Sequence, residues 1–115
     1  MNITDENFEK ETNSTDKFVL VDFFATWCEP CSVLGPILEK VVKEFPAQGG
    51  PASGGKDKIT LIKANVDDVP QNAQKFGVEK IPMVVLLKNG KLISSFVGVV
   101  PENTIKEWLE NAIKQ

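Results

Sequence analysis

Runs of apolar residues separated by polar turns predict the strands of a buried sheet. Residues 18–25 are apolar at every position but one and are rich in β-branched and aromatic side chains, which is typical of a strand covered on both faces. Residues 59–66 and 83–87 predict two further strands. Asn89-Gly90 predicts a two-residue hairpin turn that leads into a partner strand at residues 91–97.

Apolar positions at helical spacing predict two long helices. A helix that opens at Cys28 should run to about Phe45, and the last helix should start near Pro101-Glu102. The expected apolar positions are Val33, Leu34, Ile37, Leu38, Val41, Val42 and Phe45 in the first, and Ile105, Trp108, Leu109, Ala112 and Ile113 in the second.

Two short helices complete the predicted set. The first should start within residues 4–8, where acidic side chains occupy the first turn. The second should span residues 70–76, with Asp67 or Asp68 as its N-cap. Apart from the hairpin, strands and helices follow one another in turn along the chain, which favours an α/β domain.

Length, composition and charge limit the possible functions. The 115 residues predict one domain, residues 1–115, with a Pro/Gly-rich, flexible loop insertion at about residues 46–58 that we expect to be passive rather than a partner-binding element. With 13 basic and 16 acidic residues and no basic cluster, nucleic acid and anionic membranes are not expected partners. No apolar run approaches the roughly 20 residues of a membrane span, and the N-terminus lacks signal-peptide features, so we expect a cytoplasmic protein.

Cys28 and Cys31 are the only cysteines, and they follow the first strand directly. If Cys28 opens a helix, the two side chains share one face and lie close enough to form a disulfide. The helix N-terminus favours the thiolate, which is the attacking species in disulfide exchange. We therefore expect Cys28 to be the nucleophile and Cys31 to resolve the mixed disulfide. Pro30 suits the first helical turn because it has no N–H to leave unpaired.

Two other kinds of site also use cysteine pairs. A structural disulfide that closes so short a loop would constrain the unfolded chain little. A zinc site needs four ligands, and this sequence has no histidine and no second cysteine pair, so carboxylates or a second chain would have to complete it. We therefore expect a redox-active pair with no metal and no other cofactor.

Asp22 is the one polar residue inside the first predicted strand. Burial of a carboxyl disfavours its charged form and raises its pKa, so Asp22 would be able to exchange a proton near neutral pH. We expect it to be the acid/base for Cys31. The alternative is an aspartate that faces solvent at a sheet edge or caps a turn.

Several segments, in order along the chain, resemble the thioredoxin family. Residues 21–31 resemble its active-site segment, in a variant with Cys-Glu-Pro-Cys. Residues 63–67 resemble the end of its next strand, residues 76–83 the segment with its cis-proline, and residues 88–90 its hairpin turn. The resemblance implies the thioredoxin fold, in which a central mixed sheet of four to five strands is flanked by about four helices.

The same resemblance implies roles for residues outside the cysteine segment. Pro82 would be the cis-proline that faces the cysteines, although an edge-strand proline is the alternative, and the backbone of Ile81 would pair with an extended substrate. Lys63 would lie near Asp22, or else would be an ordinary solvated lysine. The expected apolar contact patch for target proteins consists of Trp27, Val66, Ile81, Pro82, Val97 and Gly98.

Glu29 departs from the family pattern, which has glycine between the cysteines. Its carboxylate should oppose ionisation of Cys28, so we expect a pair at least as reducing as one with glycine.

The expected activity is reduction of protein disulfides by a monomer. The sequence has no nucleotide-binding glycine loop, so the resemblance implies that a thioredoxin reductase, drawing on NADPH, supplies the electrons. Two alternatives remain open. An oxidase or isomerase would share the fold, although Pro30 and the absence of a signal peptide argue against it. A non-catalytic interaction subunit would use the fold only for docking.

Overall fold

The computed structural model describes residues 2–13, 18–45 and 59–114. The predicted loop at about residues 46–58 lies outside the described residues. The elements, in chain order, are α1 (Phe8–Thr12), β1 (Phe18–Phe24), α2 (Glu29–Glu44), β2 (Ile59–Asn65), α3 (Pro70–Lys75), β3 (Met83–Lys88), β4 (Lys91–Val97) and α4 (Glu102–Ile113). None of the helices in the described ranges is long and apolar enough to cross a membrane.

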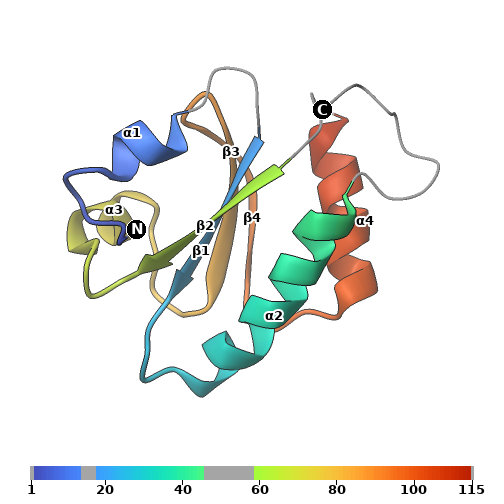
Figure 1. The fold of residues 1–115 in the computed structure, drawn as a ribbon, viewed down its shortest axis with the longest axis horizontal. Coiled ribbons are helices and arrows are strands. Elements are labelled where there is room, and N and C mark those ends of the chain that lie inside the picture. Colours follow the sequence, from blue (N-terminus) through green and yellow to red (C-terminus); the bar gives the residue numbers. More distant parts are fainter. Residues whose placement is uncertain (1, 14–17, 46–58, 115) are drawn as a thin grey trace.

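The four strands form one mixed sheet in the order β2-β1-β3-β4 (Figure 1). β1 pairs parallel with β2 and antiparallel with β3, and β3 pairs antiparallel with β4. The β3–β4 hairpin turns at Asn89 and Gly90, which both have positive φ, as expected of the predicted Asn-Gly turn. β1 is therefore a central strand, which explains why its sequence is apolar on both faces.

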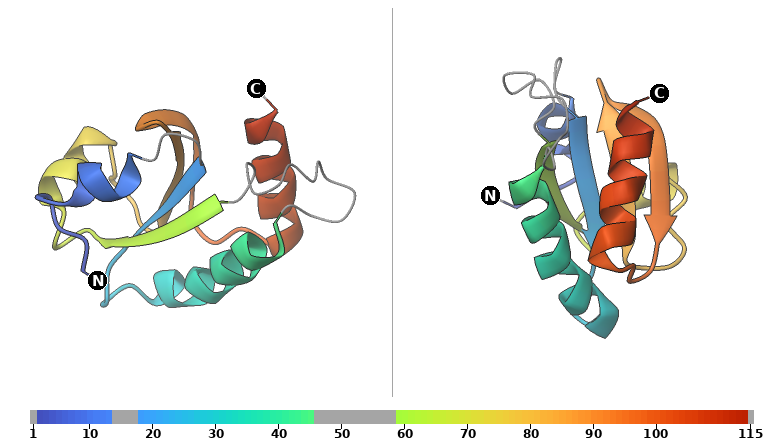
Figure 2. Two further views of the ribbon diagram at one scale, coloured as in Figure 1. Left: turned by 45° about the horizontal axis from the view of Figure 1, so that its top comes forward. Right: turned by 90° about the vertical axis from the view of Figure 1, so that its right-hand side faces the viewer.

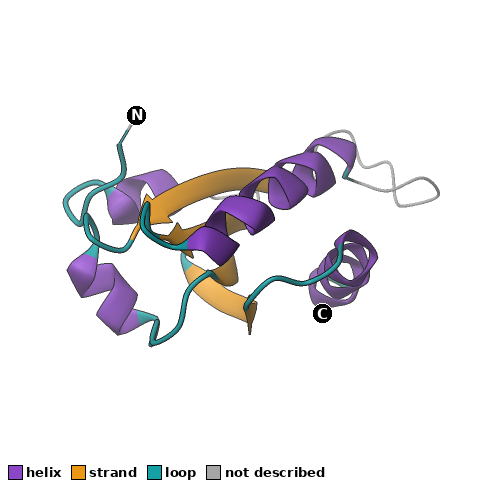
Figure 3. Ribbon diagram, turned by 90° about the horizontal axis from the view of Figure 1, so that it is seen from below, coloured by secondary structure: helices purple, strands orange, loops and turns teal. Residues whose placement is uncertain are grey.

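Alternate residues of β1 point to opposite faces of the sheet and build two cores. Val19, Val21 and Phe23 belong to the core on the side of α1 and α3. Phe18 and Leu20 belong to the core on the side of α2 and α4. Figure 3 shows the sheet between these two pairs of helices. By the same alternation Asp22 faces the α2 side, toward the helix that carries Cys31.

The prediction that Asp67 or Asp68 caps α3 is wrong. The N-cap residue is Val69, and no side chain of the predicted pair caps the helix. Instead, the carboxylate of Asp5 accepts hydrogen bonds of 3.0 Å from the backbone N–H groups of Gln71 and Asn72. The N-terminal segment lies against the start of α3, so a residue far away in the sequence satisfies the free N–H groups of its first turn.

The two long helices follow their predictions with one exception. Leu34 and Leu38 are buried, but Val33 is 52% exposed, so its assignment to the apolar face of α2 is wrong. Trp108 of α4 is half-buried and packs against the core, and its indole N–H donates a hydrogen bond of 2.9 Å to the hydroxyl of Ser94. α2 and α4 lie on the same side of the sheet (Figure 2), where Lys40 pairs with Glu102 at 3.3 Å.

Candidate active site

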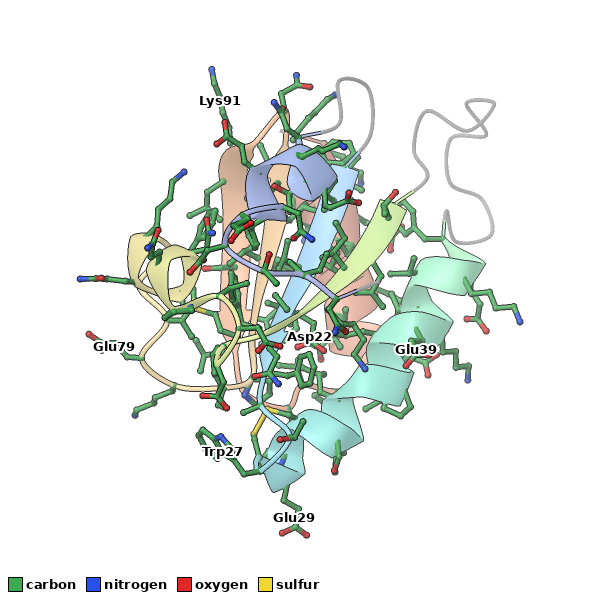
Figure 4. The ribbon with its side chains drawn as sticks, turned by 60° about the vertical axis from the view of Figure 1, so that its left-hand side comes forward. Asp22, Trp27, Glu29, Glu39, Glu79 and Lys91 are labelled. Atoms are coloured by element: carbon green, nitrogen blue, oxygen red, sulfur yellow. A yellow bond between two sulfur atoms is a disulfide. The ribbon has the colours of Figure 1, made fainter. Side chains whose placement is uncertain are left out.

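The cysteine pair lies where β1 gives way to α2. Cys28 is the N-cap residue of the helix, so the helix begins at Glu29, one residue later than predicted. Cys28 and Cys31 form a disulfide, with their Cα atoms 5.3 Å apart. Only 7% of Cys28 and 5% of Cys31 is exposed. In Figure 4 the disulfide lies at one end of the molecule, next to the labelled side chains of Trp27 and Glu29.

The start of α2 favours negative charge on the Cys28 sulfur. The backbone N–H of Cys31 points to Cys28 Sγ at 3.3 Å, so the sulfur caps the helix. A thiolate at this position would accept the same hydrogen bond and would lie at the positive end of the helix dipole. Pro30 occupies the first turn without leaving an N–H unpaired. The exposed Glu29 side chain brings a carboxylate to the same turn.

The segment before β3 forms a second wall of the site. The Ile81–Pro82 peptide bond is cis, as the resemblance implies, and Cys28 Sγ lies 3.9 Å from the Ile81 carbonyl oxygen. The backbone N–H of Gly98 donates a hydrogen bond of 2.8 Å to the Pro82 carbonyl. Gly98 has φ +93°, a conformation that favours glycine. A Cβ atom there would meet nothing within 4 Å, so backbone conformation rather than crowding accounts for this glycine.

The residues of the expected contact patch differ widely in exposure. Trp27 is 70% exposed and Val97 is 52% exposed. Val66 and Ile81 are partly buried against the cysteines. Pro82 is buried, because it leads directly into the covered strand β3, so it adds little accessible surface to the patch.

The indole of Trp27 makes a contact that sequence analysis missed. Its Nε1–H donates a hydrogen bond of 3.1 Å to Asp67 Oδ2. Asp67 follows β2, the strand next to β1, so the parallel pairing of the two strands brings their ends together. The parallel order was predictable, but the choice between Asp67 and Asp68 was not.

Asp22 is fully buried on β1, two residues before the strand ends. Neither of its carboxyl oxygens has a hydrogen-bond partner in the described part of the chain. Burial raises the pKa of Asp22 to about 6, the positive charge of Lys63 opposes that rise, and the negative charge of Glu39 adds to it. Asp22 can therefore hold or release a proton near neutral pH.

Lys63 is the cross-strand neighbour of Asp22 in the β1–β2 register. Its ammonium lies 3.8 Å from the carboxylate of Glu39 and 5.5 Å from the ring centroid of Phe24. Lys63 thus lies near Asp22 as the resemblance implies, but the ion pair that it makes is with a carboxylate on α2. Sequence analysis did not identify Glu39, because its position in the pattern is that of an ordinary charged residue on the solvent-exposed face of a helix.

The described residues offer no site for a metal ion. Within the ranges 2–13, 18–45 and 59–114, no group of three or more His, Cys, Asp or Glu side chains is arranged to hold one. The chemistry at the site rests on the cysteine pair, with Asp22, Lys63 and Glu39 as the charged or ionisable groups near the sheet and Glu29 and Asp67 as carboxylates at the surface.

Comparison with known proteins identifies the family. The family model for thioredoxin matches residues 1–111. The chain is 38% identical over 112 residues to "Thioredoxin" from Rickettsia bellii, with 97% of each chain covered. It is 36% identical over 110 residues to "Thioredoxin 2" from Chlorobaculum tepidum, covering 96% of this chain and 92% of that one. The chain therefore belongs to the thioredoxin family and is a thiol-disulfide oxidoreductase that reduces protein disulfides through its own cysteine pair, without a separate cofactor.

Proposed function

We propose that this protein reduces disulfides of cytoplasmic target proteins, with Cys28 as nucleophile, Cys31 as resolving thiol and Asp22 as acid/base. The observation that carries the proposal is the position of Cys28 Sγ at the N-cap of α2, 3.3 Å from the backbone N of Cys31. That position stabilises a thiolate. Cys28 and Cys31 are almost equally buried, at 7% and 5% exposed, so the N-cap position of Cys28 rather than its exposure supports the assignment of the two roles.

In the first step the Cys28 thiolate attacks one sulfur of a target disulfide. A new S–S bond joins Cys28 to the target, and the target's own S–S bond breaks. The electron pair of the broken bond stays on the second target sulfur, which leaves as a thiolate and takes a proton from solvent.

In the second step Asp22 removes the proton from the Cys31 thiol, directly or through one water molecule. The Cys31 thiolate attacks Cys28 Sγ, the mixed disulfide breaks, and the remaining target sulfur leaves with the electron pair and takes up a proton from Asp22 or from solvent. The protein now holds the Cys28–Cys31 disulfide, and the target has gained two electrons and two protons. A carboxyl group with a pKa of about 6 suits this task, because it is largely ionised at neutral pH and still basic enough to accept a proton.

Targets would dock on the apolar patch around the cysteines. Trp27 and Val97 provide its exposed apolar surface, and Val66 and Ile81 are partly buried against the disulfide. Gly98 is partly buried, and the buried Pro82 supports the patch from beneath. An extended target segment would pair with the backbone of Ile81, beside Cys28 Sγ. Main-chain pairing fixes the orientation of the target with little regard to its sequence.

The oxidised protein must then be reduced again. Family membership supports a thioredoxin reductase as the electron donor, most simply one that draws on NADPH. We further propose that the protein acts as a monomer in the cytoplasm, where thiols are kept reduced.

The reduction potential of the Cys28/Cys31 pair tests the direction of the reaction. We expect a value close to the roughly −270 mV that holds for thioredoxins in general, measured against a dithiol buffer of known potential. A value of roughly −120 to −180 mV would indicate an oxidase or isomerase instead. A Cys31→Ser variant should accumulate mixed disulfides with targets and a Cys28→Ser variant should not. Full biological activity of the Cys28→Ser variant would point to a docking subunit.

A further inference from the structure

Gly35 and Glu39 lie four residues apart on α2, and therefore on one face of the helix, above the end of the Lys63 side chain. The Lys63 ammonium lies 3.8 Å from Glu39 Oε2. A Cβ atom on Gly35 would lie 3.0 Å from Lys63 Nζ, so alanine there would require the flexible end of the lysine to shift by a few tenths of an ångström. Glycine is unfavourable in a helix interior, and here its lack of a side chain leaves the ammonium undisplaced.

Asp22 is the neighbour of this lysine on β1. The two residues are paired in the β1–β2 register, and both point to the α2 side of the sheet. Yet neither carboxyl oxygen of Asp22 has a hydrogen-bond partner within the described ranges. Glu39 is 60% exposed and Lys63 44% exposed, so their ion pair contributes little to stability. The Lys63–Glu39 ion pair matters here because it fixes the position of the Lys63 ammonium, not because it stabilises the fold.

We propose that Glu39 is a positioning residue that holds the Lys63 ammonium away from Asp22 and so raises the proton affinity of the buried carboxyl. Without Glu39, the ammonium would be free to approach Asp22 and stabilise its ionised form. The space beside Gly35 lets Lys63 take the position in which Glu39 holds it. Figure 4 shows Asp22 on β1 with Glu39 on the adjacent face of α2.

The charges that surround Asp22 agree with this arrangement. β2 contributes Lys63 and α2 contributes Glu39, while β3 places the uncharged Val84 opposite Asp22. Cys28 and Cys31 carry no charge in the disulfide state. Burial raises the pKa of Asp22 most, Lys63 lowers it and Glu39 raises it. The distance of the Lys63 ammonium from Asp22 therefore decides how strongly Lys63 opposes the rise in the Asp22 pKa that burial causes.

The test measures the Asp22 pKa in the oxidised protein from the NMR shift of its carboxyl carbon. Glu39→Gln should shift the titration to lower pH, and Lys63→Met should shift it to higher pH. In the Lys63→Met background, Glu39→Gln should have less than half of its effect in the otherwise wild-type chain, because there is no ammonium left to position. Glu107→Gln, on exposed α4 surface, removes the same charge and should leave the titration unchanged.

Two results would overturn the proposal. One is an Asp22 titration that Glu39→Gln leaves unchanged or moves to higher pH. The other is an equal shift by Glu39→Gln with and without Lys63, which would mean that Glu39 acts only as a distant charge. Only the kinetic consequence rests on the proposed function: the pH at which target reduction reaches half its maximal rate should fall in Glu39→Gln. A shifted Asp22 titration with no change in that pH profile would count against Asp22 as the acid/base, not against the positioning by Glu39.

Discussion

The indole N–H of Trp27 is hydrogen-bonded to the carboxylate of Asp67 at 3.1 Å. This bond ties the residue before the nucleophile to the loop that follows β2. Trp27 is 70% exposed, and the bond holds its ring in one orientation beside the disulfide. A surface ring fixed in this way offers a rigid face to a partner, which lowers the entropy lost on binding.

Loss of the Trp27–Asp67 hydrogen bond should weaken target binding but leave the rate of disulfide exchange in the bound complex almost unchanged. We expect Asp67→Ala to raise KM for a protein disulfide substrate roughly two- to fivefold, with little change in kcat, because one hydrogen bond to a charged group is lost at an exposed site. The fluorescence anisotropy of Trp27, measured in a Trp108→Phe background, should fall. Asp68→Ala, at the exposed neighbouring position, is the control. Equal effects of the two variants would contradict this role for Asp67.

The buried carboxyl of Asp22 should make the protein less stable as pH rises. Its pKa is about 6 in the folded protein, against an ordinary value of 3.8 for an aspartate in water, so the folded state binds more protons between these values. The free energy of unfolding therefore falls as pH rises from about 4 through about 6. Relative to the wild type, Asp22→Asn should be stabilised by roughly 2–3 kcal/mol more at pH 8 than at pH 4.

Urea unfolding at both pH values measures this difference. Asp68→Asn is the matched control at an exposed position and should show almost none of it. If Asp22→Asn differs from the wild type by the same free energy of unfolding at both pH values, the pKa of Asp22 is not raised in the folded protein.

Asp5 should stabilise α3 at neutral pH. Desolvation acts to raise the pKa of Asp5, but hydrogen bonds from the backbone of Gln71 and Asn72 outweigh it and hold the pKa below its usual value. Asp5→Ala should therefore lower Tm by several degrees at pH 7, because two N–H groups of the first turn lose their acceptor. The difference should shrink as pH falls through the folded pKa of Asp5. Glu6→Ala, at an exposed neighbouring position, should have little effect on thermal melting.

The Glu29 carboxylate should slow the reactions of Cys28. At low salt, Glu29→Gln and Glu29→Gly should both increase the rate of Cys28 alkylation near neutral pH by roughly twofold, through a larger thiolate fraction. High salt should reduce the difference, since the charge is exposed. A thiol that ionises at higher pH in Glu29→Gly than in the wild type would contradict this account.

Sequence reasoning found the features that depend on local pattern. The apolar run of β1, the Cys28–Cys31 spacing and the Asn89-Gly90 turn each carry their signal within a few residues. Asp22 was also recognisable, because a single carboxyl inside an otherwise apolar strand is unusual in any fold. Their roles in catalysis stay predictions.

The features that sequence reasoning missed depend on contacts between distant segments. Asp5 reaches α3, and Glu39 reaches Lys63, only because the sheet brings their elements together. Gly35 gave a weak local signal, since glycine next to proline is unusual inside a helix. No neighbouring residue in the sequence indicated that Gly35 lies beside Lys63. The exposure of Val33 was missed because helical spacing marks an apolar stripe and does not say how much of that stripe the sheet covers.

The hydrogen bond from Cys31 N–H to Cys28 Sγ makes the reactive sulfur part of the helix that it opens. The sulfur is a neutral acceptor in the disulfide and a charged one in the thiolate, so the first turn of α2 is held more firmly after reduction. Folding and reduction form a thermodynamic cycle. The free energy of the stronger hydrogen bond in the reduced state must therefore equal a difference in redox potential between the folded cysteine pair and the same pair in the unfolded chain. Substitutions that loosen the first turn of α2 would therefore change the redox potential without altering either cysteine.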